Sequence, residues 1–289
     1  MKKLTILFIF SLLIAACTPG IPERIQGAAT LGPNSINYEL SGKGKTLVLI
    51  HGGGVDYRMW DRQIDAWENE FQILRYDIRG HGESTFEDNG PPDVEDLISL
   101  SNELGIEKFS LAGLSLGGIL ATDFTLAYPN KVEKLILLSP GLSGVQEQDT
   151  TYLKPLKEMV QALQEGNNEK AIESIVDMTF KGKRNERVKG FEEEQDYLRE
   201  TFANYMASPN SARPIQLINP APLNRLRDIQ CPTLIIEGKQ DLDYMAKNAQ
   251  ILHDSIPNSS LIELPNAGHM VNVEAEAEVN NAIRDFLKK

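Results

Sequence analysis

Cysteine and histidine are both scarce in this chain, and their scarcity argues against a disulfide framework and against a metal site. Of the 289 residues, 2 are cysteines and 4 are histidines. Two cysteines, Cys17 and Cys231, cannot form a disulfide framework. The histidines lie too far apart in the sequence for the ligand spacing of a metal site. We therefore expect no bound metal. Cys231 precedes Pro232 and an apolar run, which favours a buried, unreactive thiol.

Positive charge is also in short supply. The chain has 29 lysines and arginines against 41 aspartates and glutamates, a formal net charge of -12. Such a balance repels the phosphates of nucleic acids, so we expect no nucleic-acid partner. The proportions of hydrophobic residues, 41%, and of charged residues, 24%, are ordinary for a folded domain. They argue against a mainly disordered chain or a coiled coil.

The one long apolar run stands at the N-terminus. Lys2 and Lys3 precede apolar residues 4–16, a pattern typical of a secretory signal peptide and too short to span a bilayer comfortably. Residues 14–17, Ile-Ala-Ala-Cys, resemble the signal of bacterial lipoproteins, in which the cysteine is lipidated and becomes the new N-terminus. The alternative is simple cleavage, with Cys17 incidental. We predict a signal peptide over residues 1–16 and an exported protein, anchored to a membrane of the bacterial cell envelope through lipid on Cys17.

Strand and helix patterns alternate along the rest of the chain. Alternating apolar residues predict a strand at residues 36–40, and largely apolar segments predict strands at residues 46–50, 71–76, 109–112, 132–138, 233–237 and 261–264. Helical spacing predicts helices at residues 60–67, 94–104, 117–128, 245–252 and 279–287, the second capped by Asp93. The turn at residues 41–44 predicts a hairpin between the first two strands. This alternation is typical of an α/β fold, with a mostly parallel sheet covered on both faces.

The rhythm changes between Gly141 and Leu223, where only helical patterns occur. We interpret residues 142–222 as a helical cap inserted between two parts of the core, residues 17–141 and 223–289. Residues 181–189 carry a basic cluster, and residues 192–196 are acidic. The cluster could select an anionic substrate or lipid head group. Solvated helices with compensating charge are the simpler interpretation.

A candidate nucleophile follows the strand at residues 109–112. The sequence G-L-S-L-G at residues 113–117 has the G-x-S-x-G pattern, and it stands directly before a predicted helix. A sharp turn from strand to helix holds such a serine in strained backbone geometry and exposes its hydroxyl at the edge of the sheet. The alternative is an ordinary glycine-rich turn. We predict that Ser115 is the nucleophile.

A serine hydroxyl needs a base, and the base needs a group that orients it. Asp241 follows the strand at residues 233–237, and His269 follows the strand at residues 261–264, so both can reach the sheet edge of Ser115. The order Ser, Asp, His along the chain is the one found in α/β-hydrolases. Asp243 is the rival for the orienting role, although it could instead cap the next helix. We therefore predict Ser115, Asp241 and His269 as the catalytic residues.

The tetrahedral intermediate of acyl transfer needs fixed hydrogen-bond donors. The sequence H-G-G-G at residues 51–54 follows the strand at residues 46–50, and its glycines allow backbone N–H groups to face a substrate oxygen. We assign Gly53 and Leu116 as the donors, with Gly54 as an alternative in the loop; a plain flexible turn is the competing interpretation. His51 is expected to shape this loop. Residues 77–84, D-I-R-G-H-G-E-S, are expected to brace the site through hydrogen bonds.

These motifs together resemble the α/β-hydrolase fold superfamily, from about Ile36 to the C-terminus and excluding most of the cap. Serine at position 115 departs from the haloalkane dehalogenase and epoxide hydrolase branches, which carry aspartate there. The H-G-G-G loop is similar to that of carbon–carbon bond hydrolases, and the superfamily also includes lactonases, aminopeptidases and cofactor-free perhydrolases. The resemblance implies that the cap covers Ser115 and sets the acyl pocket.

We therefore predict a serine hydrolase that acts without a cofactor on a small carboxylic ester or related acyl substrate, through an acyl-enzyme. The other members of the superfamily named above remain alternatives. A different class is also open, because the same fold serves non-hydrolytic proteins that bind a small molecule without turnover.

Overall fold

The computed structural model describes residues 24–86, 91–145, 150–208 and 215–289. The predicted signal segment and Cys17 lie outside these residues. Within the described part of the chain, no helix combines the length and the apolarity that crossing a bilayer would require.

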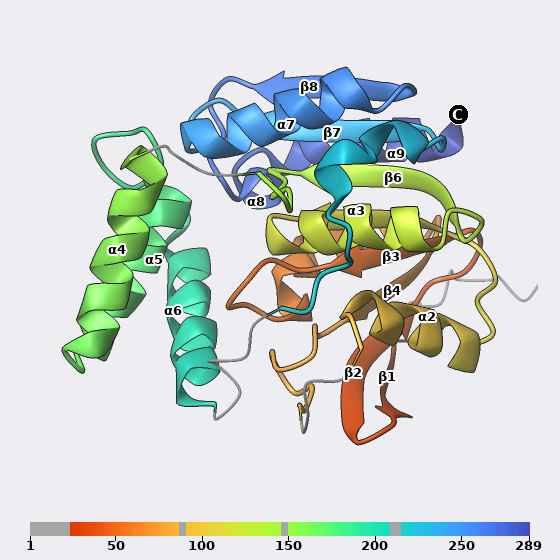
Figure 1. Cartoon of the computed structure of the whole chain (residues 1–289), viewed down its shortest axis with the longest axis horizontal. Helices are drawn as coiled ribbons and strands as arrows, with labels where there is room; N and C mark the ends of the chain where they lie inside the picture. Colours follow the sequence, from red (N-terminus) through yellow and green to blue (C-terminus); the bar gives the residue numbers. More distant parts are fainter. Residues whose placement is uncertain (1–23, 87–90, 146–149, 209–214) are drawn as a thin grey trace, which may run out of the picture.

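The core is one sheet of eight strands in the order β1-β2-β4-β3-β5-β6-β7-β8. Pairing is antiparallel from β1 to β2 and from β2 to β4, and parallel for every other neighbouring pair. The α/β fold class predicted from the alternating pattern is therefore confirmed (Figure 1). The strands are β1 (Ile25–Leu31), β2 (Asn34–Ser41), β3 (Thr46–Ile50), β4 (Gln72–Tyr76), β5 (Phe109–Leu114), β6 (Val132–Leu138), β7 (Thr233–Gly238) and β8 (Ser259–Leu264).

The predicted hairpin is wrong. β2 forms its hairpin with β1, around a turn in which Gly32 has a φ of 64°, and its other neighbour is β4. β3 instead lies between β4 and β5 and runs parallel to both. The physical reason is burial: Leu47 to Ile50 of β3 are at most 1% exposed, so this strand needs neighbours on both sides and cover on both faces.

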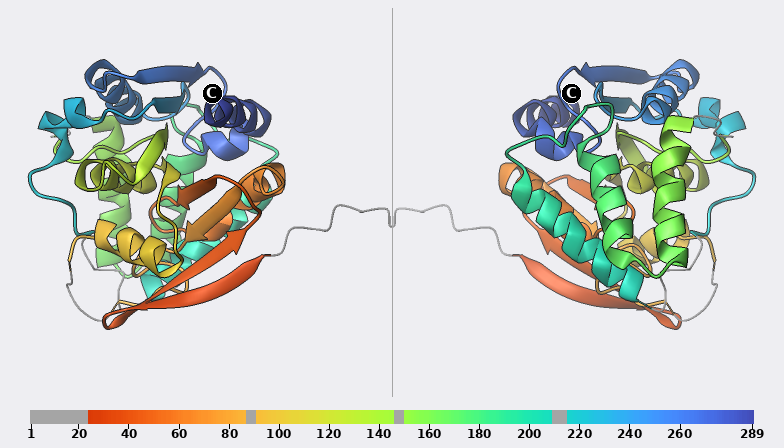
Figure 2. Two further views of the ribbon diagram at one scale, coloured as in Figure 1. Left: turned by 90° about the vertical axis from the view of Figure 1, so that its right-hand side faces the viewer. Right: turned by 90° about the vertical axis from the view of Figure 1, so that its left-hand side faces the viewer.

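Helices cover both faces of the sheet, as the side views in Figure 2 show. Buried side chains between the helices and the sheet form two hydrophobic cores. The first core packs α2 (Val94–Glu103), α3 (Leu116–Ala127) and α7 (Asp243–Ser255) against the strands. The second core packs α1 (Asp61–Trp67), α8 (Val271–Glu274) and α9 (Glu276–Lys288) against the opposite face. Asp93 occupies the position before α2, as predicted, but its side chain makes no capping hydrogen bond there.

Three further helices lie between β6 and β7, where only helical patterns were predicted. They are α4 (Thr150–Gln164), α5 (Asn168–Phe180) and α6 (Glu192–Ala207), and they face the viewer in the right-hand panel of Figure 2. Charged residues of the cap also pair with residues outside the cap. Arg184 pairs with Glu274 and Lys183 with Asp243, both in the core, while Glu194 accepts a hydrogen bond from Arg62. The first two pairs connect the cap to the segments that follow β7 and β8, and the third connects it to α1.

Candidate active site

Ser115 stands at a sharp turn between β5 and α3. Its backbone has φ 56° and ψ -111°, a conformation that is strained for a residue with a side chain. Close packing around the turn requires glycine on both sides. A Cβ on Gly113 would lie 2.1 Å from the carbonyl oxygen of Gly117, and a Cβ on Gly117 would lie 2.2 Å from the oxygen of Ile50. The G-L-S-L-G sequence thus packs against β3 and holds Ser115, which is partly exposed, above the strand end.

Asp241 and His269 meet at the same edge of the sheet. The Nδ1 atom of His269 lies 2.7 Å from Oδ2 of Asp241. The Asp241 carboxylate is fully buried, and its Oδ1 accepts a hydrogen bond of 2.7 Å from the backbone N–H of Leu242. Asp243, the rival orienter, opens α7 with its side chain 70% exposed and pairs with Lys183 at 2.6 Å. The structure therefore brings Asp241, and not Asp243, into contact with His269.

The surroundings of His269 favour its protonated form. Burial of the ring, which is 13% exposed, would by itself lower the pKa. The charge of Asp241, its hydrogen bond to the ring and the charge of Glu274 together outweigh burial and raise the pKa of His269 above 6.5. With its proton on Nδ1, the ring donates to Asp241 and leaves Nε2 to accept a proton.

Glu274 and Arg184 hold the loop that carries His269. Neither residue was predicted from the sequence to belong to this site. Oε2 of Glu274 accepts hydrogen bonds from the backbone N–H of Gly268, at 2.9 Å, and from Arg184, at 2.6 Å. Arg184 also donates to the backbone oxygen of Asn266 at 2.6 Å. A cap residue and a core carboxylate, 1% exposed, thus fix the loop from both sides. No pattern in the sequence pairs residues 184 and 274, since only the fold brings them together.

The loop after β3 is held by hydrogen bonds to the loop after β4. His51 is fully buried, and its Nε2 accepts a hydrogen bond of 2.9 Å from the backbone N–H of Ile78. Burial lowers the pKa of His51, which keeps the ring neutral and able to accept this bond. Asp77 accepts hydrogen bonds from the backbone N–H groups of Tyr57 and Glu83 at 2.8 and 2.9 Å. Both stretches make the structural contacts expected of them.

Gly53 and Leu116, the two residues assigned as oxyanion donors, line the same cavity as Ser115 and His269. Leu116 begins α3, so its N–H is one of the first four amides that find no partner within a helix. Gly54 has a φ of 74°, and a Cβ there would lie 2.4 Å from the ring of Phe202. That contact explains why the loop needs glycine next to the cap.

Cys231 lies apart from these groups. It is a free, half-buried thiol, and burial raises its pKa, so it remains protonated and unreactive at neutral pH. Among the described residues, no group of histidine, cysteine, aspartate and glutamate side chains is arranged to hold a metal ion.

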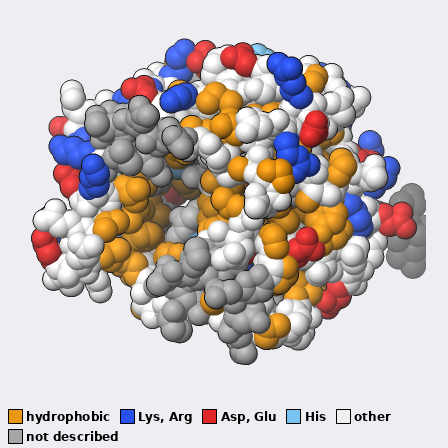
Figure 3. Space-filling model, viewed as in Figure 1, with side chains coloured by type: hydrophobic (Ala, Val, Ile, Leu, Met, Phe, Trp, Pro, Cys, Tyr) orange, Lys and Arg blue, Asp and Glu red, His pale blue; other side chains and the backbone are white. Residues whose placement is uncertain are grey.

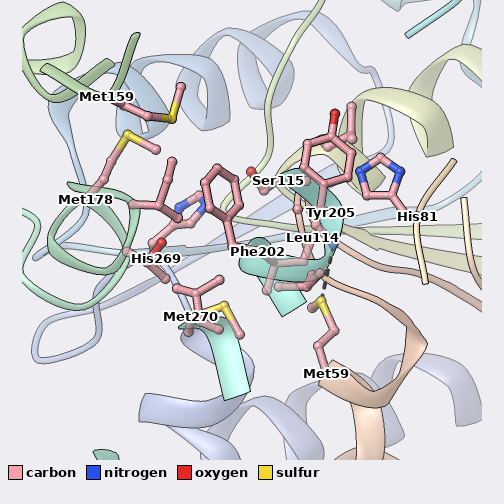
Figure 4. Close-up of a pocket in the computed structure, with 18 of the residues that line it drawn as sticks. Met59, His81, Leu114, Ser115, Met159, Met178, Phe202, Tyr205, His269 and Met270 are labelled. Atoms are coloured by element: carbon pink, nitrogen blue, oxygen red, sulfur yellow. Dashed lines mark hydrogen bonds between the residues drawn. The ribbon is translucent and has the colours of Figure 1, made fainter. Parts of the chain in front are cut away.

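The cavity lies between the cap and the carboxyl ends of the strands and has a volume of about 530 Å³. This volume is in the usual range for pockets that bind small molecules. Figure 4 shows Ser115 within it between the rings of Phe202 and Tyr205, which belong to the cap, and His269 on the other side of Phe202. A serine in strained geometry and a histidine oriented by a buried carboxylate therefore face the same cavity. Chemically, this arrangement suits attack on an acyl carbon.

Comparison with known proteins gives an independent view of the same chain. A model of the alpha/beta hydrolase family matches residues 47–282. An (E)-2-((N-methylformamido)methylene)succinate hydrolase of Acinetobacter baylyi is 25% identical over 255 residues, which cover 87% of this chain and 94% of that protein. A pimeloyl-[acyl-carrier protein] methyl ester esterase of Pectobacterium atrosepticum is 26% identical over 245 residues, covering 81% of this chain and 91% of that protein.

Among solved structures, an N-acyl homoserine lactone degrading enzyme has a TM-score of 0.74 at 24% identity. The match covers 90% of this chain and 100% of that one. At this level of identity the likeness establishes a shared fold.

Proposed function

Because this chain belongs to the α/β hydrolase family, we propose that it is a serine hydrolase that cleaves a carboxylic ester through an acyl-enzyme on Ser115. The hydrolytic activity of the relatives supports the reaction class, and the methyl ester esterase of Pectobacterium atrosepticum supports an ester as substrate. One observation carries the proposal further than the family alone. His269 and the buried Asp241 are in contact at 2.7 Å, at the edge of the cavity that Ser115 lines.

The reaction proceeds in two halves. Oγ of Ser115 forms a bond to the carbonyl carbon of the ester while its proton passes to Nε2 of His269. Backbone N–H groups of Gly53 and Leu116 stabilise the negative charge on the carbonyl oxygen. When the bond to the alcohol breaks, the proton on His269 goes to the departing oxygen, which leaves an acyl group on Ser115.

Water then completes the cycle. A water molecule gives one proton to His269 and bonds to the acyl carbon, and the bond to Ser115 breaks as its oxygen recovers that proton. The products are an alcohol and a carboxylic acid, and the side chains return to their starting state. Asp241 accepts the hydrogen bond from Nδ1 throughout and stabilises the imidazolium that forms twice in each cycle.

A fluorophosphonate probe tests the nucleophile directly. We expect the wild-type protein to be labelled on Ser115, and Ser115→Ala to lose labelling and ester hydrolysis while keeping its folded circular dichroism spectrum. Ser143 offers a matched control, because its Oγ donates to Asp123 at 3.4 Å, away from the cavity, and Ser143→Ala is expected to label normally. Labelling that persists in Ser115→Ala would overturn the assignment. A folded wild-type protein that never labels would favour the non-hydrolytic binding protein.

A further inference from the structure

Methionine is concentrated in one place in this structure. The sequence has 7 methionines, and every one after Met1 lines the cavity beside Ser115. They come from six different segments, three in the core and three in the cap: Met59, Met245 and Met270, and Met159, Met178 and Met206. Figure 4 shows Met159 and Met178 side by side on the cap side of the cavity, and Met59 and Met270 on the core side.

Charged side chains are missing from the lining of the same cavity. No lysine, arginine, aspartate or glutamate is among the described residues that line the cavity. Apart from Ser115 and His269, its polar side chains are those of His81, Thr179 and Tyr205. The ion pairs of the cap, such as Arg184 with Glu274, lie outside this lining. Figure 3 shows hydrophobic side chains gathered where the cap meets the core.

Methionine side chains give the lining of this cavity particular properties. Methionine is unbranched, has three rotatable bonds and adapts its shape to irregular apolar partners. The lining also holds branched aliphatic side chains such as Leu198 and Ile215, and the six methionines add flexible side chains that can follow a chain that bends. The lack of lysine and arginine also matters, because a carboxylate moved from water into this cavity loses its hydration without gaining a permanently charged partner.

From these observations we propose that the substrates are uncharged esters with a flexible aliphatic acyl chain, held by the methionine wall formed by the six residues named above. The proposal rests on the proposed function and adds the chemical class of the substrate. The acyl part is assigned to the wall because it stays bonded to Ser115 after the alcohol leaves. The cavity beside Ser115 must therefore hold the acyl part through both halves of the reaction.

The first test is a series of p-nitrophenyl esters, from acetate to butyrate, hexanoate and octanoate, with wild-type protein. Each methylene buried in the transition state contributes roughly 0.8 kcal/mol, so kcat/KM should rise about fourfold per methylene until the cavity is full. From acetate to hexanoate we expect a rise on the order of 100-fold. A flat series, or one that falls after acetate, would refute the proposal.

A matched pair of esters tests the missing charge. The p-nitrophenyl monoester of adipic acid has the chain length of the hexanoate, with a carboxylate in place of the terminal methyl group. We expect its kcat/KM to be at least about 100-fold lower than that of the hexanoate. Equal rates, or a preference for the adipate, would show that the wall accepts an anion and would overturn the proposal.

Substitutions then locate this preference in the wall. Met178→Lys should reduce the preference for hexanoate over adipate monoester at least about tenfold, because the ammonium group pairs with the carboxylate. Met159→Lys, on the neighbouring helix of the cap, is a second variant with the same expectation. Asn185→Lys adds the same charge at an exposed position of the cap outside the lining and should leave rates and preference unchanged. If the preference of both methionine variants equals that of Asn185→Lys, the wall does not set the selectivity.

The outcomes distinguish failure of the proposed substrate class from failure of the proposed serine hydrolase function. A protein that is not labelled by fluorophosphonate and hydrolyses no ester contradicts the serine hydrolase. A protein that is labelled on Ser115 and hydrolyses all the esters, but shows neither the rise with chain length nor the loss with the carboxylate, contradicts only the substrate class. All rates are divided by the concentration of labelled sites, so that partial unfolding of a variant is not mistaken for selectivity.

Discussion

Replacing Glu237 with glutamine is expected to stabilise the folded protein at neutral pH. Glu237 lies on β7, four residues before Asp241, and is 2% exposed. Neither of its carboxylate oxygens has a hydrogen-bond partner. Burial, followed by the charge of Asp241, raises the pKa of Glu237 from 4.5 to about 10. The carboxyl group is therefore neutral in the folded protein at pH 7 and ionised in the unfolded chain.

The sign and size of the effect follow from that difference. A pKa that is raised on folding favours the folded state below pH 4.5, and this advantage is lost progressively as the pH rises towards about 10. Each pH unit above 4.5 costs ~1.4 kcal/mol, so the protonation of Glu237 costs the folded state about 3 kcal/mol at pH 7. Glutamine has the same shape and no proton to take up. Glu237→Gln should thus gain about 3 kcal/mol in the free energy of unfolding at pH 7 and nothing near pH 4.

Urea unfolding at several pH values measures this difference. The matched control is Glu263→Gln, at the position of β8 that pairs with Glu237, where the side chain is 51% exposed and pairs with Lys239 at 3.1 Å. Its substitution should change the free energy of unfolding by less than about 1 kcal/mol at every pH. If the gain of Glu237→Gln does not grow between pH 4 and pH 8, or if this variant is less stable than wild type at pH 7, the reasoning is refuted.

Four further predictions concern the site and the anchor. Asp241→Asn should lower kcat about 10⁴-fold in ester hydrolysis, and Asp243→Asn should stay within about tenfold of wild type; equal losses would remove the distinction between them. The acid limb of the pH profile of kcat/KM should lie above pH 6.5, because the raised pKa of His269 means that its neutral form is lost earlier as the pH falls. Glu274→Gln should move that limb to lower pH by removing one of the charges that raise this pKa, and an unmoved limb would contradict the electrostatic effect of Glu274 on His269. Finally, the mature protein should sediment with membranes and carry lipid on its N-terminal cysteine, whereas Cys17→Ser should be released or left unprocessed; an unmodified wild-type protein free of membranes would refute the anchor.

The parts of the molecule that could be predicted from sequence are those in which one segment carries its own signal. The apolar run of residues 46–50 predicts β3 (Thr46–Ile50) with the right bounds, because a strand covered on both faces is apolar along most of its length. The turn at Ser115 was predictable for a similar reason, since only glycine fits at positions 113 and 117. In both cases the structural requirement acts within one short segment, so the residue types of that segment reveal it.

The parts that could not be predicted depend on partners far apart in the chain. β1 (Ile25–Leu31) contains Gln26, Gly27 and Thr30, lacks clear alternation, and is stabilised by pairing with β2. The contact of Arg184 with Glu274 joins two charged residues that look solvent-exposed in the sequence. The sequence also left Asp243 open as an alternative to Asp241. Choosing between carboxylates two residues apart requires knowing that one is buried and the other begins a helix.

The methionine wall has a consequence for how the protein would respond to oxidants. Oxidation turns a methionine thioether into a polar, chiral sulfoxide, and reductases can reverse the change. Met159, Met178 and Met206 are only half-buried, so peroxide that enters the cavity reaches them there, while neither core of the sheet is formed by these residues. Oxidative damage would therefore begin at the surface that holds the substrate, and binding of an apolar chain would weaken before the protein unfolds.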